Sequence, residues 1–303
     1  MALWRVLVEG QPRLAVGLVG GGPVKLLDAA VTLDGLLAGP PGTFERALGQ
    51  ALDDASPAAA AVPVPAGAPL LAPVEGQPVW AAGVTFRRSR EARLEESGGL
   101  DAYDKVYQAA RPELFFKALP GTARGPGEPV GVRADSDWNV PEPELALVAD
   151  AHGEIVAYTA GNDVSSRSIE GENPLYLPQA KVYEGSCALG PCLVPLAEAP
   201  ALATLRISLA IERAGRELFS AACAVADMRR TPGELVGWLY RALRFPAGAV
   251  LLTGTSIVPP ADVSLLPGDR VTVAISGLGE LANPVEAVSY APPPGSRGAA
   301  RSG

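Results

Sequence analysis

From Glu113 onward, short apolar runs alternate with turns made of Gly, Pro and Asp. Runs of about four to eight apolar and β-branched residues that are bounded by turn residues are typical of strands. We therefore predict a β-rich region with strands at five places: Leu145–Val148, Ile155–Thr159, Leu205–Ile211, Ala249–Thr253 and Arg270–Ile275.

One helix is indicated within this β-rich region. Thr231 precedes Pro232, and Glu234 occupies the third helical position, as in a capping box. We predict a helix from Pro232 to Leu243.

The first 77 residues have a different pattern. Apolar runs such as Leu14–Val19 alternate with Gly20–Pro23, and a helical pattern follows around Phe44–Leu52. This mixture predicts a small α+β unit. The segment Ala58–Pro78 is rich in Ala, Pro and Val, as expected of a semi-rigid connection. We place a domain boundary near residue 77.

Two further segments differ from the β-rich pattern. Residues 87–111 are charged, and we expect one or two short helices there that form a mobile cover. Residues 291–303 are rich in Pro and Gly, so we expect a disordered tail. A larger domain would then span residues 78–290.

The composition excludes several classes of protein. The chain is 48% hydrophobic and 19% charged, which is ordinary for a soluble globular protein. The sequence lacks an apolar run approaching the roughly 20 residues that span a bilayer, and Glu9 and Arg13 interrupt any signal-peptide core. We predict a cytoplasmic protein without membrane association.

Charge and cysteine content narrow the partners and the compartment. A net charge of −8 and a pI near 4.9 oppose binding to nucleic acid. Cys187, Cys192 and Cys223 lack the paired spacing of a zinc site or a disulfide framework. Free thiols in a reducing compartment are expected.

The first chemical signal is a pair of carboxylates. Glu142 and Glu144 stand two residues apart, so they project from the same face of a strand. An isolated pair of this kind usually lies on a solvated face. Here Glu144 leads directly into an apolar strand, and repulsion between the carboxylates requires a cation or protonation. Mg²⁺, which prefers hard oxygen ligands, would relieve it.

Asp163 and Lys181 extend this signal. Asp163 ends a β-type run, where it is either a third oxygen ligand or a cap of the turn that follows. Lys181 ends a segment of low charge, where it is either a surface residue with a buried stem or a buried catalytic amine. The residues alone leave both alternatives open.

In this order, the residues resemble the fumarylacetoacetate hydrolase superfamily, in which a Glu-x-Glu pair, an Asp and a catalytic Lys follow one another. The resemblance covers about residues 79–290. It implies an α+β, β-rich fold: a mixed β-roll catalytic domain with a small N-terminal α+β domain. Its motifs here are Gly83–Phe86, Pro112–Lys117, Gly161–Ser165, Leu252–Thr255 and Leu266–Asp269.

Within the superfamily, Ser168–Tyr183 is similar to the dehydratases that act on 2-keto-3-deoxy-D-arabinonate. This implies the loss of water from that acid, or from an epimer, to give 2,5-dioxopentanoate. The resemblance implies Mg²⁺, with Mn²⁺ or Ca²⁺ as substitutes, held by Glu142, Glu144 and Asp163. A metal on the C1 carboxylate and C2 keto oxygen stabilises the enolate left when C3 loses a proton, and the C4 hydroxyl then departs.

The resemblance also implies the remaining site residues. Lys181 and Glu113 are the expected acid/base pair, with their individual roles unassigned. A second group is expected to surround the substrate: Phe86, Arg87, Lys117 and Thr255. From the residues alone, the two cations fit solvated charges equally well, and the phenylalanine fits a core position equally well.

The one histidine of the sequence bears on the choice of reaction. His152 lies in Asp150–Glu154, which we predict to be a turn between two strands. Carbon–carbon bond hydrolases of the superfamily use a His–Glu pair on a lid, and residues 87–111 contain glutamates but no histidine. Dehydration is therefore favoured over the alternative, an acylpyruvate hydrolase or oxaloacetate decarboxylase.

Two hypotheses lie outside catalysis: a protein that only binds a sugar acid, and an interaction scaffold whose carboxylates bind nothing. The expected partner is a small 2-keto sugar acid. Because the family usually pairs its catalytic domains, we expect a homodimer or homotetramer.

Overall fold

The computed structural model describes residues 1–52, 62–89, 91 and 101–288, and its strands form three sheets. The largest sheet has ten strands, in the spatial order β4 (Val62–Pro63), β3 (Gly22–Leu26), β2 (Gln11–Leu18), β1 (Ala2–Val8), β12 (Cys187–Pro195), β10 (Ile155–Asp163), β9 (Pro143–Ala149), β15 (Ala249–Leu252), β5 (Val79–Gly83) and β6 (Glu113–Ala118). The second has five: β14 (Arg216–Ala224), β13 (Arg206–Arg213), β16 (Arg270–Ile275), β17 (Gly279–Val288) and β7 (Val130–Arg133). The third pairs β11 (Ser165–Ser166) with β8 (Asn139–Val140).

Both large sheets are mixed, because β15 runs parallel to β5 and β17 runs parallel to β7 among otherwise antiparallel pairs. The α-helices are α1 (Leu33–Ala38), α2 (Thr43–Leu52), α4 (Asp101–Gln108), α5 (Arg167–Glu172), α6 (Leu177–Lys181) and α7 (Pro232–Leu239). Short 3₁₀ turns are η2 (Pro174–Tyr176), η3 (Leu202–Thr204) and η4 (Val225–Asp227). The predicted β-rich α+β fold is confirmed, as is each of the five predicted strands.

Strand β9 shows how the core is divided. All seven of its residues are buried. Leu145 and Leu147 point into a core shared with the five-stranded sheet, whereas Ala146 and Val148 point into a second core. This alternation follows from the two-residue period of a strand. Glu144, near the start of β9, lies on the same face as Ala146 and Val148, so one face of this strand fills the second core and also supplies a carboxylate.

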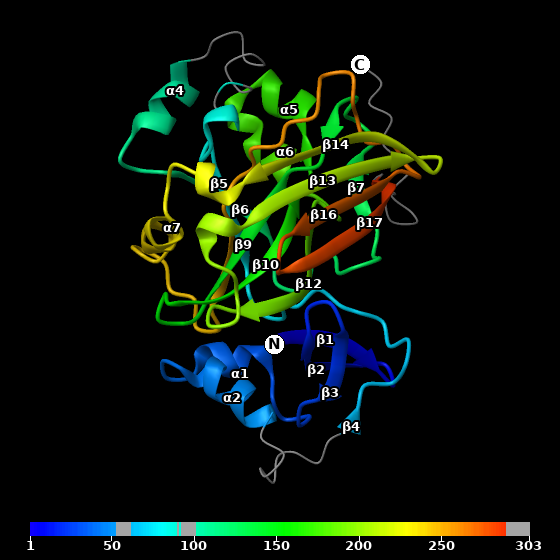
Figure 1. The fold of residues 1–303 in the computed structure, drawn as a ribbon. Coiled ribbons are helices and arrows are strands. Elements are labelled where there is room, and N and C mark those ends of the chain that lie inside the picture. Colours follow the sequence, from blue (N-terminus) through cyan, green and yellow to red (C-terminus); the bar gives the residue numbers. More distant parts are fainter. Residues whose placement is uncertain (53–61, 90, 92–100, 289–303) are drawn as a thin grey trace, which may run out of the picture.

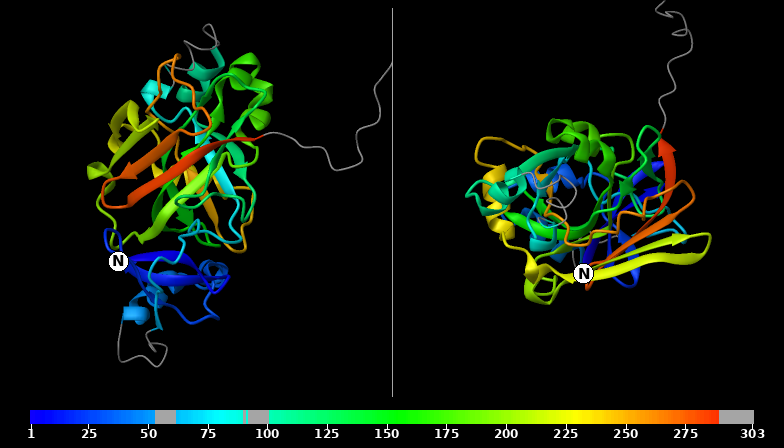
Figure 2. Two further views of the ribbon diagram at one scale, coloured as in Figure 1. Left: turned by 90° about the vertical axis from the view of Figure 1, so that its right-hand side faces the viewer. Right: turned by 90° about the horizontal axis from the view of Figure 1, so that it is seen from above.

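The N-terminal strands β1–β3 and helices α1 and α2 form one end of the molecule (Figure 1), and the side view shows the same division (Figure 2). They are nevertheless continuous with the rest. Strand β1 pairs with β12 at Leu3 and Leu193. Leu37 is fully buried in the second core together with Val148 and Val250. The polypeptide thus buries one apolar surface across the boundary predicted near residue 77.

The predicted connection Ala58–Pro78 and the covering segment are only partly described. Residues 53–61, 90 and 92–100 lie outside the described residues, as does the predicted tail 291–303. In the part of the connection that the structure describes, the backbone follows the N-terminal sheet, since Val64 N–H donates to Val24 O and Leu71 N–H donates to Arg5 O.

The predicted helix at Pro232 begins as expected and ends earlier. Thr231 caps it by accepting a hydrogen bond from the Glu234 N–H. The prediction that it runs to Leu243 is wrong, because the helix ends at Leu239. Tyr240 turns the chain inward: its hydroxyl donates to Asp150 O at 2.8 Å, and its ring packs on Phe245.

Candidate metal and active site

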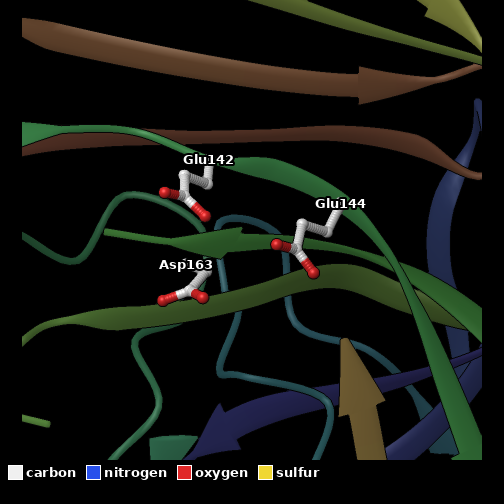
Figure 3. Close-up of side chains that lie close together, drawn as sticks. All are labelled: Glu142, Glu144 and Asp163. Carbon is white, nitrogen blue, oxygen red and sulfur yellow. The ribbon is translucent and has the colours of Figure 1, made fainter. Parts of the chain in front are cut away.

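Two neighbouring strands bring three carboxylates together. Glu142 directly precedes β9, Glu144 lies on β9, and Asp163 is the last residue of β10. The strands are antiparallel, with Glu144 opposite Gly161 and the Asp163 N–H donating to Glu142 O at 2.9 Å. One oxygen from each carboxylate lies within 4.8 Å of the others, and all three side chains are buried (Figure 3).

Cations surround these carboxylates. Lys181, the last residue of α6, directs its Nζ to Glu142 Oε2 at 2.9 Å and to Asp163 Oδ2 at 3.1 Å. Its third partner is Ser165 Oγ at 2.6 Å. The Arg167 guanidinium donates to Glu142 Oε1 at 2.9 Å. Hydrogen bonds in which both partners are charged are stronger than neutral ones, so these contacts fix the carboxylates in position.

Glu144 has a different environment from the other two carboxylates. Burial raises the pKa of Glu144 well above its ordinary value of 4.5, and the charges of Asp163 and Glu142 raise it further. The Gly254 N–H, 2.6 Å from Glu144 Oε2, opposes this shift. A buried carboxylate beside two others costs free energy that a cation would offset. Three converging carboxylate oxygens therefore fit Mg²⁺, which takes hard oxygen ligands.

A pocket opens onto the carboxylates. Its empty space, counted together with the part open to solvent, is about 440 Å³. Charged side chains make up much of its lining: Glu113, Glu142, Glu144, Asp163, Arg167, Glu170 and Lys181. Five carboxylates facing two cations leave an excess of negative charge, which again suits a divalent cation.

Two glycines let polar groups approach the pocket closely. Gly83 on β5 pairs with Glu113 on β6, and a Cβ at position 83 would overlap the Glu113 carboxylate. Gly254 has a φ of +93°, and a Cβ there would overlap the Thr85 side chain. The absence of a side chain at these positions therefore sets where Glu113 and the Gly254 N–H lie.

The predicted substrate-binding residues are not all at the pocket. Thr255 is buried and lines the pocket. The expected acid/base residue Glu113 also lines it. Phe86 is buried and lies outside the lining, where its backbone bridges to Met228. The Arg87 side chain is 80% exposed and pairs with Glu91 at 2.9 Å. Lys117 lies behind Asp163 and is likewise outside the lining.

His152 lies in the predicted turn between β9 and β10. It is exposed, and the backbone N–H groups of His152 and Glu154 both donate to Asp150 Oδ1. Its Nε2 lies 3.1 Å from Gly39 O at the end of α1. The histidine therefore contacts the N-terminal unit rather than the pocket.

Sequence reasoning missed three residues of the site: Ser165, Arg167 and Glu170. They follow Asp163 within seven positions, on β11 and the first turns of α5. Arg167 and Glu170 are 2% and 5% exposed. On a helix, Arg and Glu three residues apart usually indicate a solvated face, which is why the pattern did not identify them. Their proximity in sequence to Asp163 was the available signal.

Among the described helices, none is both long and apolar enough to cross a membrane.

Comparisons with known proteins identify similar sequences and structures. The family model described as fumarylacetoacetate (FAA) hydrolase C-terminal matches residues 80–286. A probable 2-keto-3-deoxyxylonate dehydratase of Haloferax volcanii is 51% identical over 216 residues, which are 71% of this chain and 74% of that protein. The 2-dehydro-3-deoxy-D-arabinonate dehydratase of Saccharolobus solfataricus is 44% identical over 218 residues, which are 71% and 73%.

Solved structures extend the likeness to nearly the whole chain. A 2-keto-3-deoxy-D-arabinonate dehydratase complexed with magnesium and 2,5-dioxopentanoate matches with a TM-score of 0.80 at 33% identity. The match covers 96% of this chain and 100% of that chain, so it includes the N-terminal unit as well as the sheets that carry the carboxylates.

Proposed function

The chain belongs to the fumarylacetoacetate hydrolase family, and we propose that it is a Mg²⁺-dependent hydro-lyase that removes water from a 2-keto-3-deoxy pentonate. The expected substrate is 2-keto-3-deoxy-D-arabinonate or an epimer, and the expected product is 2,5-dioxopentanoate. Relatives at 51% and 44% identity carry the names of such dehydratases. A matching structure holds magnesium and that product.

One observation of this chain carries the proposal. Three buried carboxylates and the Lys181 ammonium converge in a single pocket that Glu113 also lines. A metal-binding group and two groups able to transfer protons are what dehydration beside a keto group requires. Bound to Glu142, Glu144 and Asp163, Mg²⁺ would supply polarisation of the substrate's keto oxygen.

The residues of the chain would then move protons. One member of the pair Lys181 and Glu113 takes a proton from C3, and the other gives a proton to the C4 hydroxyl as the C4–O bond breaks and water leaves. Tautomerisation of the unsaturated product places the second carbonyl at C5. Thr255, at the pocket wall, would contact the bound acid.

The test is an assay of purified protein with Mg²⁺ and 2-keto-3-deoxy-D-arabinonate, with oxaloacetate and an acylpyruvate as control substrates. We expect 2,5-dioxopentanoate from the sugar acid and little turnover of the controls. Lys181→Met and Glu113→Gln should each lower kcat at least 100-fold. No turnover of the arabinonate or its epimers, with cleavage of an acylpyruvate, would contradict the proposal.

Proton exchange in deuterated buffer assigns the two roles. The variant that lacks the base should lose both deuterium uptake at C3 and dehydration. The variant that lacks the acid should keep the uptake while it loses dehydration. Nuclear magnetic resonance of the substrate measures both.

Three finer points belong to the same proposal. Mn²⁺ or Ca²⁺ would replace Mg²⁺ at the carboxylates, which activity assays after chelation test. The protein would form a homodimer or homotetramer, which light scattering tests. It would reside in the cytoplasm.

A further inference from the structure

Lys117 on β6 is a buried lysine that contacts Asp163 and does not line the pocket at the carboxylates. Its side chain is 0% exposed. Its Nζ lies 2.5 Å from Asp163 Oδ1, and it donates to Val164 O at 2.9 Å and to Lys181 O at 2.5 Å. Two of these contacts are hydrogen bonds to backbone carbonyls, and the third is an ion pair with the Asp163 carboxylate.

These contacts join three elements. Asp163 and Val164 lie at the end of β10, Lys181 ends α6, and Lys117 itself belongs to β6. The two oxygens of Asp163 are thereby divided: Oδ1 faces the Lys117 ammonium, while Oδ2 faces the Lys181 ammonium. At the same time, the backbone of Lys181 is held by Lys117, and its ammonium by Ser165 and the carboxylates.

We propose that Lys117 is a positioning residue: it sets the rotation of the Asp163 carboxylate and the place of the Lys181 backbone, and it does not contact the substrate. The inference deepens the proposed function, because the two residues it holds are a metal ligand and a proton-transfer group of that reaction. It replaces the expectation that this lysine offsets the charge of the substrate carboxylate.

If Lys117 loses its ammonium, a purely electrostatic role and a positioning role predict opposite changes in metal affinity. Removing a positive charge beside three carboxylates would by itself strengthen their attraction for a cation. Releasing Asp163 Oδ1 lets that carboxylate rotate away from the orientation that its Oδ2 now has, which weakens metal binding. A weaker metal affinity therefore reports orientation.

The experiment compares Lys117→Met and Lys117→Arg with wild type and with Lys25→Met. Lys25 is a matched control, because its Nζ also donates to a backbone carbonyl, Ala51 O at 2.7 Å, but in the N-terminal unit. The first readout is the Mn²⁺ dissociation constant, measured by electron paramagnetic resonance, which also counts the metal sites per protein. The second is kcat and KM at saturating Mg²⁺, with kcat divided by that number of sites.

We expect Lys117→Met to raise the Mn²⁺ dissociation constant at least 10-fold and to lower kcat at least 30-fold, with KM within 3-fold of wild type. Lys117→Arg keeps the charge, and the wider guanidinium should still lower kcat at least 10-fold. Lys25→Met should match wild type in every readout.

Two results would overturn the inference. The first is a higher KM with unchanged kcat in Lys117→Met, which would indicate contact with the substrate. The second is tighter Mn²⁺ binding, or kcat per site equal to wild type in both Lys117 variants, which would leave the lysine a role in charge or stability alone. If the wild type binds Mn²⁺ without dehydrating the keto acid, the proposed function fails, and the Mn²⁺ affinities still test the positioning.

Discussion

Glu144 is the residue at which function and stability oppose each other most directly. Its carboxylate is buried, and its pKa is raised well above 4.5 by that burial and by the charges of Asp163 and Glu142. The folded protein therefore favours the protonated form, whereas the unfolded chain ionises near pH 4.5. Without a metal, the ionised side chain destabilises the fold.

The sign of the pH dependence follows. A raised carboxylate pKa contributes stability below the unfolded pKa, and that contribution is lost as the pH rises toward the folded pKa. In EDTA, we expect the free energy of unfolding of the wild type to fall from pH 5 to pH 8. Glu144→Gln should flatten this dependence and make the metal-free protein more stable at pH 8, as measured by urea unfolding.

Mg²⁺ should reverse the order. A ligand present at 100 times its dissociation constant stabilises a protein by about 2.7 kcal/mol, and the wild type should gain on that scale. Glu144→Gln, with a ligand oxygen lost, should gain much less. A Gln variant that is less stable than wild type in EDTA at pH 8 would show that the carboxylate does not destabilise the apo fold.

At the residue scale, the sequence identifies candidate metal ligands better than the residues that hold those ligands in position. Strand alternation predicted that Glu142 and Glu144 share a face, the family resemblance added Asp163, and the structure brings the three carboxylates together. Lys117 was not recognisable in this way, because its role depends on Asp163 standing between it and the pocket, which only the packing of β6 against β10 and α6 determines. Arg87 was expected to contact the substrate, and its side chain is mostly exposed to solvent in the structure.

At the scale of elements, the buried side chain of Arg230 links the end of α4 to α7. Arg230, 5% exposed, donates to the carbonyls of Ala109 at 2.6 Å and Ala110 at 3.1 Å. It also reaches Val106 O and pairs with Glu234 on α7. The C-terminal carbonyls of a helix lack partners within it, and Arg230 donates to one of those of α4, at Val106, and to the two carbonyls that follow the helix.

Arg230→Met should therefore release the end of α4. We expect the free energy of unfolding to fall by about 1–3 kcal/mol, because these part-buried carbonyls lose their donor. Amides of residues 105–112 should exchange hydrogen faster, as measured by mass spectrometry. Arg216→Met, at an exposed position on β14, is the control, and equal exchange in the two variants would contradict this account of the helix junction.

Elements of regular pattern were predictable, and their ends were less so. The five strands have apolar runs bounded by turn residues, so local sequence is sufficient. Helix α7 ends just before Tyr240, whose hydroxyl donates a hydrogen bond to the backbone oxygen of Asp150, 90 positions away in the sequence. Helix-stop signals near Leu243 do not contain that information.

At the scale of the whole molecule, the N-terminal unit shares its core with the sheet that carries the site. Leu37 on α1 is 0% exposed and packs among residues of both parts. The Ala151 N–H also donates to Leu37 O, which ties α1 to the turn that contains His152.

We expect Leu37→Ala to lower the free energy of unfolding by about 2–5 kcal/mol in one cooperative transition. Urea unfolding followed by circular dichroism and by tryptophan fluorescence should give coincident curves, since Trp4 and Trp80 lie on either side of the predicted boundary. Leu18→Ala, at a side chain that is 64% exposed, should change the stability little. Separate transitions would mean that the two parts unfold independently.

The carboxylates of the site stand at the ends of β9 and β10, which lie inside the ten-stranded sheet with partners on both sides. Much of the remaining wall of the pocket comes from other segments: Val84 and Ser89 after β5, Glu170 on α5, and Thr255 and Val258 after β15. The metal-binding carboxylates and the rest of the pocket wall can therefore change independently in sequence. Substitutions in the wall segments, natural or designed, can admit an acid of different shape. The strand pairing of β9 and β10 meanwhile keeps the three carboxylates in place.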